Sequence, residues 1–382
     1  MSTLNVESIS HPTSGSNVTI NGITPASTGS LGLRNLIING AMQVAQRGTS
    51  LSLAHDGTTN GYLTDRFRVA LSGTDQYDCT VTQSTDAPEG FASSLLITTG
   101  TAETTVDAAE YGSIQHRIEA QNMQLLSSGT SDAKTTTLSF WVKSSQTGTY
   151  VVSIYKNDST ARGITATYAI STADTWEYKT LTFAGDTDSS GGIDNDNGLG
   201  WIVSWVLGAG SDYTSTDSTS WIDYVNAGFA YGQTTNGVLT TANATFAITG
   251  VQLEVGSVAT PFEHRSYGDE LARCQRYFYK WERENGQGQL GQVQVYSGTQ
   301  AWGRLLVFPV RMRTSPTFSS NGTFRFFNHT LSTGHDVTWS TTYTGPTQFG
   351  AAISGGSSLT AGHCSGVYAN ADGDYLHFDA EL

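Results

Sequence analysis

Short stretches of alternating polar and apolar residues, separated by turns rich in Gly, Asp and Ser, most restrict what this chain can fold into. Residues 138–143 and 150–155 are typical, with Gln146, Thr147 and Gly148 between them. Alternation buries one face of a β-strand, and the turn predicts that these two strands pair as a hairpin. Charged residues make up only 14% of the chain, against about 25% in ordinary soluble proteins, too few for long surface helices. The sequence therefore predicts an all-β protein whose main part is a jelly-roll β-sandwich.

The pattern divides the 382 residues into four parts. Residues 1–33 hold apolar pieces that bury too little to fold alone, so we expect an extended segment that docks on another protein, with a flexible tail as the alternative. Residues 34–265 form the jelly roll, starting with a buried strand at 35–40, and residues 282–382 form a smaller β-sandwich. The side chains expected to dock are Leu4, Val6, Ile9, Val18, Ile20 and Ile23.

A short linking helix is predicted at residues 266–281, between the two sandwiches. Ser266 followed three residues later by Asp269 matches a capping box at its start. Its apolar stripe has helical spacing and consists of Leu271, Cys274, Phe278 and Trp281.

The charge balance excludes two classes of partner. With 19 basic and 33 acidic residues, the formal net charge is −14, which does not provide the positive surface that nucleic acid or an anionic membrane requires. The three cysteines, Cys79, Cys274 and Cys364, have neither zinc spacing nor a disulfide framework. No secretory signal or long apolar span is apparent, so we expect synthesis in the cytoplasm without membrane insertion.

One loop concentrates acidic residues, and it is the only candidate for a metal site in the sequence. Oxygen ligands on a Gly-rich loop suit calcium, but the twelfth position of an EF-hand pattern is Asn197 rather than Glu. A solvated acidic turn is therefore favoured over calcium, and no cofactor is predicted. The loop also lacks the rigidity and burial that a pair of catalytic carboxylates needs. Its carboxylates are Asp186, Asp188, Asp194 and Asp196.

Catalytic motifs are missing from the sequence. It contains no G-x-S-x-G nucleophile motif and no HExxH zinc motif. Residues 286–291 match GxGxxG, but they follow the predicted helix and precede a strand, the reverse of the order in a nucleotide site. We therefore expect a protein that is not an enzyme.

Aromatic residues are abundant, with eight Trp, 17 Tyr and 15 Phe in a chain with little charge. Exposed rings among polar side chains bind sugars, since sugar C–H groups stack on the rings while hydroxyls form hydrogen bonds. Trp302, Trp339 and Tyr343 border Gly-, Thr- and Ser-rich segments and are the candidates for an exposed receptor-binding site; the alternative is that they fill the small domain's core. The tryptophans predicted to lie in the main core are Trp141, Trp176, Trp201 and Trp205.

Several segments together resemble tail-fibre and related virion proteins of tailed bacteriophages. They are residues 35–40, 46–48, 64–67, 139–150, 173–183, 248–281 and 308–317. The stretch at 248–281 is the most specific, and residues 2–22 resemble the virion-attached end of such proteins, whereas the last 60 residues match no pattern that we can name. The resemblance implies a jelly roll similar to carbohydrate-binding modules, a homotrimer, and adsorption to a bacterial surface.

The sequence and the resemblance lead to one expected function. We expect a structural adhesin of the virion tail, attached to other tail or baseplate proteins through residues 1–33 and binding host surface polysaccharide or lipopolysaccharide through residues 282–382. A capsid-attached fibre or decoration protein is one alternative. A polysaccharide-degrading tailspike enzyme is another, but the sequence shows no repeat of fixed period. A bacterial carbohydrate-binding module would normally carry a signal peptide.

Overall fold

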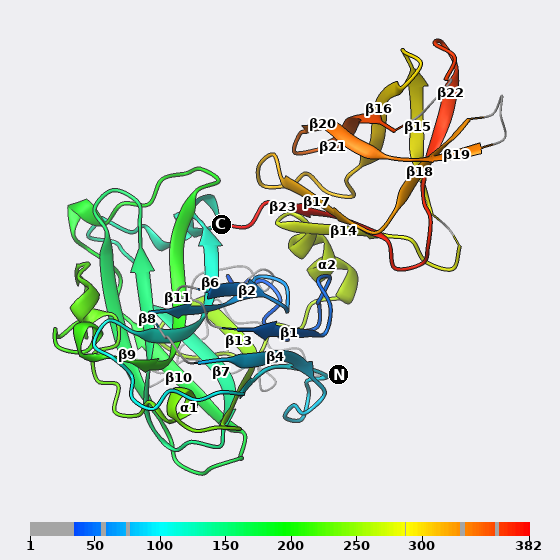
Figure 1. The fold of residues 1–382 in the computed structure, drawn as a ribbon. Helices are drawn as coiled ribbons and strands as arrows, with labels where there is room; N and C mark the ends of the chain where they lie inside the picture. Colours follow the sequence, from blue (N-terminus) through cyan, green and yellow to red (C-terminus); the bar gives the residue numbers. More distant parts are fainter. Residues whose placement is uncertain (1–33, 55–58, 74–76, 287, 329–332, 356–358) are drawn as a thin grey trace, which may run out of the picture.

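The computed structural model describes residues 34–382 except 55–58, 74–76, 287, 329–332 and 356–358. The docking side chains predicted within residues 1–33 lie outside this part. Figure 1 shows two β-units with the helix α2 (Tyr267–Gln275) between them. Of the helices in the described residues, none is both long and apolar enough to span a membrane.

The first unit, called here the first sandwich, consists of two antiparallel sheets. In spatial order one sheet contains β1 (Ser50–Leu53), β4 (Cys79–Ser84), β5 (Ser94–Thr99), β13 (Thr245–Val255), β7 (Thr136–Ser144) and β10 (Glu177–Phe183). The other contains β12 (Ile222–Asp223), β9 (Arg162–Ile170), β8 (Gly148–Lys156), β11 (Leu199–Ala209), β6 (Tyr111–Glu119), β3 (Phe67–Ser72) and β2 (Thr59–Tyr62). Short helices lie in the connections: η1 (Ala120–Leu126), η2 (Ser189–Gly191), η3 (Ser211–Tyr213), η4 (Asn226–Gly228) and α1 (Gly237–Thr240).

Successive strands of the first sandwich cross between the sheets, as in a jelly roll. Strands β5, β6, β7 and β8 alternate from one sheet to the other. The all-β, jelly-roll fold class is therefore confirmed, but the predicted hairpin is wrong. Strand β7 pairs with β10 and β13, and β8 pairs with β9 and β11, so the short link between β7 and β8 is a corner between two sheets. Both strands are buried, and crossing between sheets lets each contribute side chains to one shared core.

The core between these sheets explains which tryptophans are buried. Trp205 is fully buried, and its ring centroid lies 5.8 Å from that of Phe140 across the sandwich. Trp201 is buried as well, as predicted. Trp141 and Trp176 are only partly buried, so their placement in the core is wrong. Trp141 alternates with the inward-facing Phe140 along β7 and therefore faces outward.

The predicted strand at residues 35–40 is an irregular buried segment instead. The side chain of Asn35 substitutes for a partner strand, since its Oδ1 accepts from the amides of Ile37 (2.9 Å) and Leu253 (3.0 Å). Asn39 has a φ of 61°, and a Cβ on Gly40 would lie 2.1 Å from the carbonyl oxygen of Val251. The left-handed turn and this close approach to β13 exclude a regular ladder here.

The second unit, called here the terminal sandwich, also has two antiparallel sheets around its own core. The smaller sheet contains β14 (Phe278–Glu282), β23 (Tyr375–Asp379) and β17 (Thr317–Asn321). The larger contains β19 (Thr333–Asp336), β18 (Phe324–Asn328), β22 (Cys364–Ala369), β15 (Gln289–Val295), β16 (Gln300–Val307), β21 (Gln348–Ser354) and β20 (Thr338–Thr344). This agrees with the small C-terminal sandwich that the sequence predicts.

The linking helix is shorter than predicted. It begins at the capping residue Ser266, whose Oγ accepts from the amide of Asp269 at 3.2 Å, and it ends at Gln275 instead of 281. Phe278 and Trp281, expected on its apolar stripe, lie on β14 and pair with Asp379 and Leu376 of β23. Pairing with the last strand of the chain satisfies the backbone of this segment and overrides its helical spacing.

Two groups of buried polar contacts fix the terminal sandwich to the first one. Glu119, at the end of β6, accepts hydrogen bonds from Arg276 Nε (3.0 Å) and from the hydroxyl of Tyr277 (2.7 Å). After β23 the chain returns to the first sandwich, as Figure 1 shows, and Glu381 pairs there with Arg47 and Arg66. The linking segment is therefore held from both sides.

Candidate functional site

The outer face of the large terminal sheet carries an aromatic surface. Along β15 and the residue that follows it, Val293 and Val295 are buried in the core, whereas Gln292, Gln294 and Tyr296 are exposed. This strict alternation places the side chains of Gln292, Gln294 and Tyr296 on the solvent face of the sheet. The same face continues over β16, β21 and β20, which follow β15 in the sheet.

Strand register brings the rings together. Trp302 of β16 lies opposite Gln294 on one side and Ala352 on the other, and Tyr343 of β20 lies opposite Gly350. Tyr296, Trp302, Tyr343 and Ala352 line a shallow pocket of about 440 Å³. The three rings remain 46%, 53% and 60% exposed, respectively. Small residues at positions 350 and 352 leave the floor between the rings open.

Close strand contacts at glycines keep this floor flat. A Cβ on Gly303 would lie 2.5 Å from the carbonyl oxygen of Gln292, and one on Gly350 would lie 3.0 Å from that of Gly303. These positions therefore admit no larger side chain without movement of the backbone.

A β-bulge determines which aromatic residues of β20 reach the pocket. Trp339 pairs with Ile353 and Thr341 with Ala352, so Ser340 is an extra residue in β20. Because of it, Trp339 and Tyr343, four positions apart, point to opposite faces of the sheet. The ring of Trp339 packs inward on Phe318, with centroids 5.4 Å apart. The structure therefore brings Trp302 and Tyr343 together and packs the third candidate, the partly buried Trp339, against the core from the other face. Tyr296 lies beside them and was missed, although its alternation along residues 292–296 marks it as exposed.

The chemistry of this pocket suits a neutral, hydroxyl-rich ligand. Its walls are aromatic, and the exposed Gln292 and Gln294 belong to the same face of the sheet. None of the four lining residues is an acid, a base with a pKa near neutrality, or a thiol. Flat rings can stack on sugar C–H groups, and the amides can hydrogen-bond to sugar hydroxyls.

A second group of outward-facing aromatic residues lies on the first sandwich. Trp141 and Tyr178 are opposite one another on β7 and β10, with ring centroids 5.3 Å apart. Trp176 precedes β10, and its Nε1 donates to Asp86 at 3.1 Å. Hydrogen bonding of the indole at the surface explains why this tryptophan lies outside the core.

The acidic loop is organised by basic side chains of the protein. Asp186 is buried, and its Oδ2 accepts from Arg162 Nε at 2.8 Å. The ammonium of Lys156 donates to the carbonyl oxygens of Asp158 (2.6 Å), Ser190 (3.3 Å) and Gly192 (3.2 Å). Burial lowers the pKa of Lys156, and neighbouring Asp186 and Asp158 oppose this effect.

These contacts bear directly on the predicted calcium ligands. Asp188 caps η2 through the amide of Ser190 (2.9 Å), while the amide of Asp194 donates to Asp158 (3.2 Å) and that of Gly198 to Asp196 (2.8 Å). Within the described residues, no group of three or more His, Cys, Asp or Glu side chains could hold a metal ion. The structure therefore does not bring the four predicted aspartates together as ligands.

Chelation provides a test of this arrangement. We expect the melting temperature of the full-length protein to be the same in calcium and in excess chelator, because Arg162 pairs with Asp186 and Lys156 occupies carbonyl oxygens of the loop. A tight structural ion, at 100 times its dissociation constant, would add about 2.7 kcal/mol to the free energy of unfolding. Differential scanning calorimetry in both buffers measures the effect. A drop in melting temperature that added calcium reverses would contradict the prediction.

Comparison with known proteins gives similar structures but no family. No family model and no curated protein matches the sequence. The solved structures similar to the chain include the enzymatically active domain of tailspike protein 4 from bacteriophage CBA120, with 13% identity and a TM-score of 0.30 over 58% of this chain and 21% of that one. A putative sugar binding protein from Bacteroides thetaiotaomicron matches with 12% identity and a TM-score of 0.30, over 58% of this chain and all of that one. A family 11 carbohydrate-binding module from Clostridium thermocellum matches with 11% identity and a TM-score of 0.24, over 57% of this chain and 92% of that one.

Proposed function

We propose that this chain is a non-enzymatic adhesin of a phage tail that binds a glycan of the host surface through the aromatic pocket of its terminal sandwich. The observation that carries the proposal is the convergence of three half-exposed rings, Tyr296, Trp302 and Tyr343, on one open floor. Exposed rings of this kind are costly to leave in water and mark binding surfaces. The resemblance of residues 248–281 to tail-fibre proteins supports the virion location.

Removal of a single ring tests the glycan site. We expect Trp302→Ala to weaken binding of the full-length protein to host cells or purified surface polysaccharide at least tenfold, equivalent to about 1.4 kcal/mol. The melting temperature should stay nearly constant, because the ring is 53% exposed and belongs to no core cluster. Adsorption isotherms with labelled cells measure the affinity.

Tyr178→Ala provides the matched control. This tyrosine is also exposed, at 45%, but it lies on the first sandwich. We expect its variant to bind as tightly as the unmodified protein. If Trp302→Ala and Tyr343→Ala both retain full affinity, the glycan site lies elsewhere and the proposal fails.

The tailspike-enzyme alternative predicts cleavage of the polysaccharide. Glycoside hydrolysis requires two carboxyl groups about 5 to 9 Å apart around the bond that breaks. The residues that line the pocket include no carboxylate, which favours binding without cleavage. New reducing ends after incubation of the polysaccharide with the protein would favour the enzyme instead.

The proposed assembly is a homotrimer attached through residues 1–33. A trimer would cover the apolar pieces of this segment with one another. Light scattering should then give three times the chain mass of 40.7 kDa. A mass of 40.7 kDa at micromolar concentration would contradict the trimer, and a position on the head in a particle reconstruction would favour the capsid-fibre alternative.

A further inference from the structure

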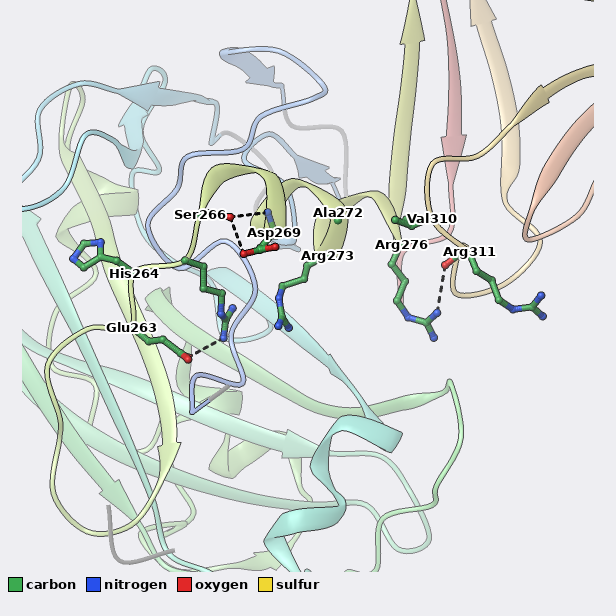
Figure 2. Close-up of a pocket in the computed structure, with 10 residues that line it drawn as sticks. Glu263, His264, Ser266, Asp269, Ala272, Arg273, Arg276, Val310 and Arg311 are labelled. Atoms are coloured by element: carbon green, nitrogen blue, oxygen red, sulfur yellow. Dashed lines mark hydrogen bonds and ion pairs between the residues drawn. The ribbon is translucent and has the colours of Figure 1, made fainter. Parts of the chain in front are cut away.

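A basic cleft lies beside the linking helix, away from the aromatic pocket. Its volume is about 570 Å³. The loop before α2 forms one wall, one side of α2 forms the roof, and Val310 and Arg311 of the terminal sandwich close the other end, as shown in Figure 2. The cleft thus spans the junction between the two sandwiches.

The charge of this cleft is opposite to that of the protein. The chain has 19 basic and 33 acidic residues, yet four arginines line the cleft against two acids, Glu263 and Asp269. Such a local excess of positive charge in an acidic chain concentrates anions at one place. The arginines are Arg265, Arg273, Arg276 and Arg311.

Two of the four arginines are paired with acids. Arg265 lies 3.2 Å from Glu263 and 3.5 Å from Glu270. Arg276 Nη2 lies 2.5 Å from Glu119 Oε1, and the hydrogen bonds that Arg276 donates to Glu119 raise the pKa of Arg276. These two guanidinium groups therefore have their charge compensated inside the protein.

The other two, Arg273 and Arg311, form no ion pair within the described residues. Arg273 lies four residues after Asp269 on the helix, but the carboxylate of Asp269 accepts from Ser266 Oγ at 2.7 Å and makes no salt bridge with it. In the same region, Arg265 Nε is buried and has no hydrogen-bond partner. The cleft therefore holds positive charge and donor capacity that the protein itself does not use.

Helix geometry places Arg273 beside Arg276. Residues three apart are neighbours on a helix surface, and Figure 2 shows both side chains leaving the same side of α2, with Arg311 beyond Arg276. Arg276 Nη1 contacts only the carbonyl oxygen of Arg311, at 3.5 Å, and so retains donors for a ligand. An anion below α2 would therefore meet the unpaired Arg273 together with the Nη donors that Arg276 does not use on Glu119.

We propose that this cleft binds a phosphate group. Guanidinium groups recognise phosphate through paired, charge-assisted hydrogen bonds. A phosphate group carries about −1.5 to −2 charge and three strong acceptor oxygens near neutral pH, so it matches two guanidinium groups better than the single charge of a carboxylate does. The site is separate from the aromatic pocket and does not depend on the proposed glycan binding.

Calorimetry with inorganic phosphate and pyrophosphate on the full-length protein, at constant ionic strength, tests the proposal. We expect Arg273→Gln to weaken pyrophosphate binding about tenfold, which is the loss expected when one charge-assisted hydrogen bond is removed. Asp269→Asn should strengthen binding, because it removes one of the two acids that line the cleft. Lys134→Gln is the charge-matched control: this exposed lysine is outside the cleft, and its variant should bind like the unmodified protein.

Two further measurements identify the source of the phosphate. Lipopolysaccharide core oligosaccharide is compared before and after chemical removal of its phosphates. If dephosphorylation of the oligosaccharide lowers its affinity for the unmodified protein but not for Arg273→Gln, the cleft binds phosphate carried by a glycan. If the protein binds inorganic phosphate but not the oligosaccharide, the cleft binds a small free ligand. Trp302→Ala should leave pyrophosphate binding unchanged, so failure of the glycan site and failure of this one are distinguishable.

The proposal is overturned if pyrophosphate does not bind at tens of millimolar. It is equally overturned if Arg273→Gln and Arg311→Gln both bind like the unmodified protein while melting at the same temperature.

Discussion

Replacement of Glu119 by alanine should lower the free energy of unfolding by about 3–5 kcal/mol, the cost of breaking a buried ion pair from one side. Glu119 is fully buried where β6 meets the linking segment. Its carboxylate accepts from Arg276, from the hydroxyl of Tyr277 and from the side chain of Gln121. Alanine would leave the buried Tyr277 hydroxyl and the Arg276 guanidinium without their partner.

Urea denaturation of the full-length variant measures this loss. Each sandwich has its own core, so unfolding is followed by two probes to detect separate transitions. Asp336→Ala is the control, because Asp336 pairs with Arg325 at 2.8 Å and both side chains are exposed; its variant should unfold at the same urea concentration as the unmodified protein. A Glu119→Ala variant as stable as this control would contradict the prediction.

The sequence predicts the fold class well because polar and apolar residues alternate with a period of two, which is typical of β-strands. It failed where pairing between distant segments decided the structure. Residues 278–281 fit a helical stripe, but β23, almost 100 residues later, pairs with them as a strand. The link between β7 and β8 resembles a hairpin turn, yet the strands find partners in different sheets. Local spacing contains no information about which remote strand is available.

The aromatic pocket was predicted in part for the same reason. The exposure of Trp302 follows from its small polar neighbours and from simple alternation with the buried Ala301. Trp339 and Tyr343 are four positions apart, which is the spacing of two residues on the same face of a regular strand. Only the bulge at Ser340 places them on opposite faces. A bulge depends on register against β21, which the sequence of β20 alone does not reveal.

Buried charges were the least predictable feature. Lys156 and Arg66 are each at most 1% exposed, although Lys and Arg are rarely fully buried. Each is buried because distant residues supply its partners: the carbonyl oxygens of residues 190 and 192 surround Lys156, and Glu381 pairs with Arg66. The acidic loop therefore looks like a cation site in the sequence, whereas in the structure a lysine of a neighbouring strand provides the cation.

Replacement of Glu381 by alanine should also cost about 3–5 kcal/mol, because it removes the partner of the buried Arg66. The side chains of Glu381 and Arg66 are 5% and 1% exposed. Asp379→Ala is the matched control two residues earlier: Asp379 pairs with Arg47 at 3.0 Å but is 44% exposed, so its loss should cost under about 1 kcal/mol. Urea denaturation compares the variants, and equal effects of both substitutions would contradict the prediction.

The double variant Glu119→Ala/Glu381→Ala tests whether the two contacts act together. They meet at Tyr277, whose hydroxyl donates to Glu119 and whose ring lies 3.5 Å from the guanidinium carbon of Arg66. Residues that share a partner are coupled by about 0.5–3 kcal/mol, so the double variant should lose less stability than the sum of the single losses. Strict additivity would mean that the two contacts hold the terminal sandwich independently. Coupling would mean that Tyr277 joins them into one contact, and that the terminal sandwich is released from the first as a unit.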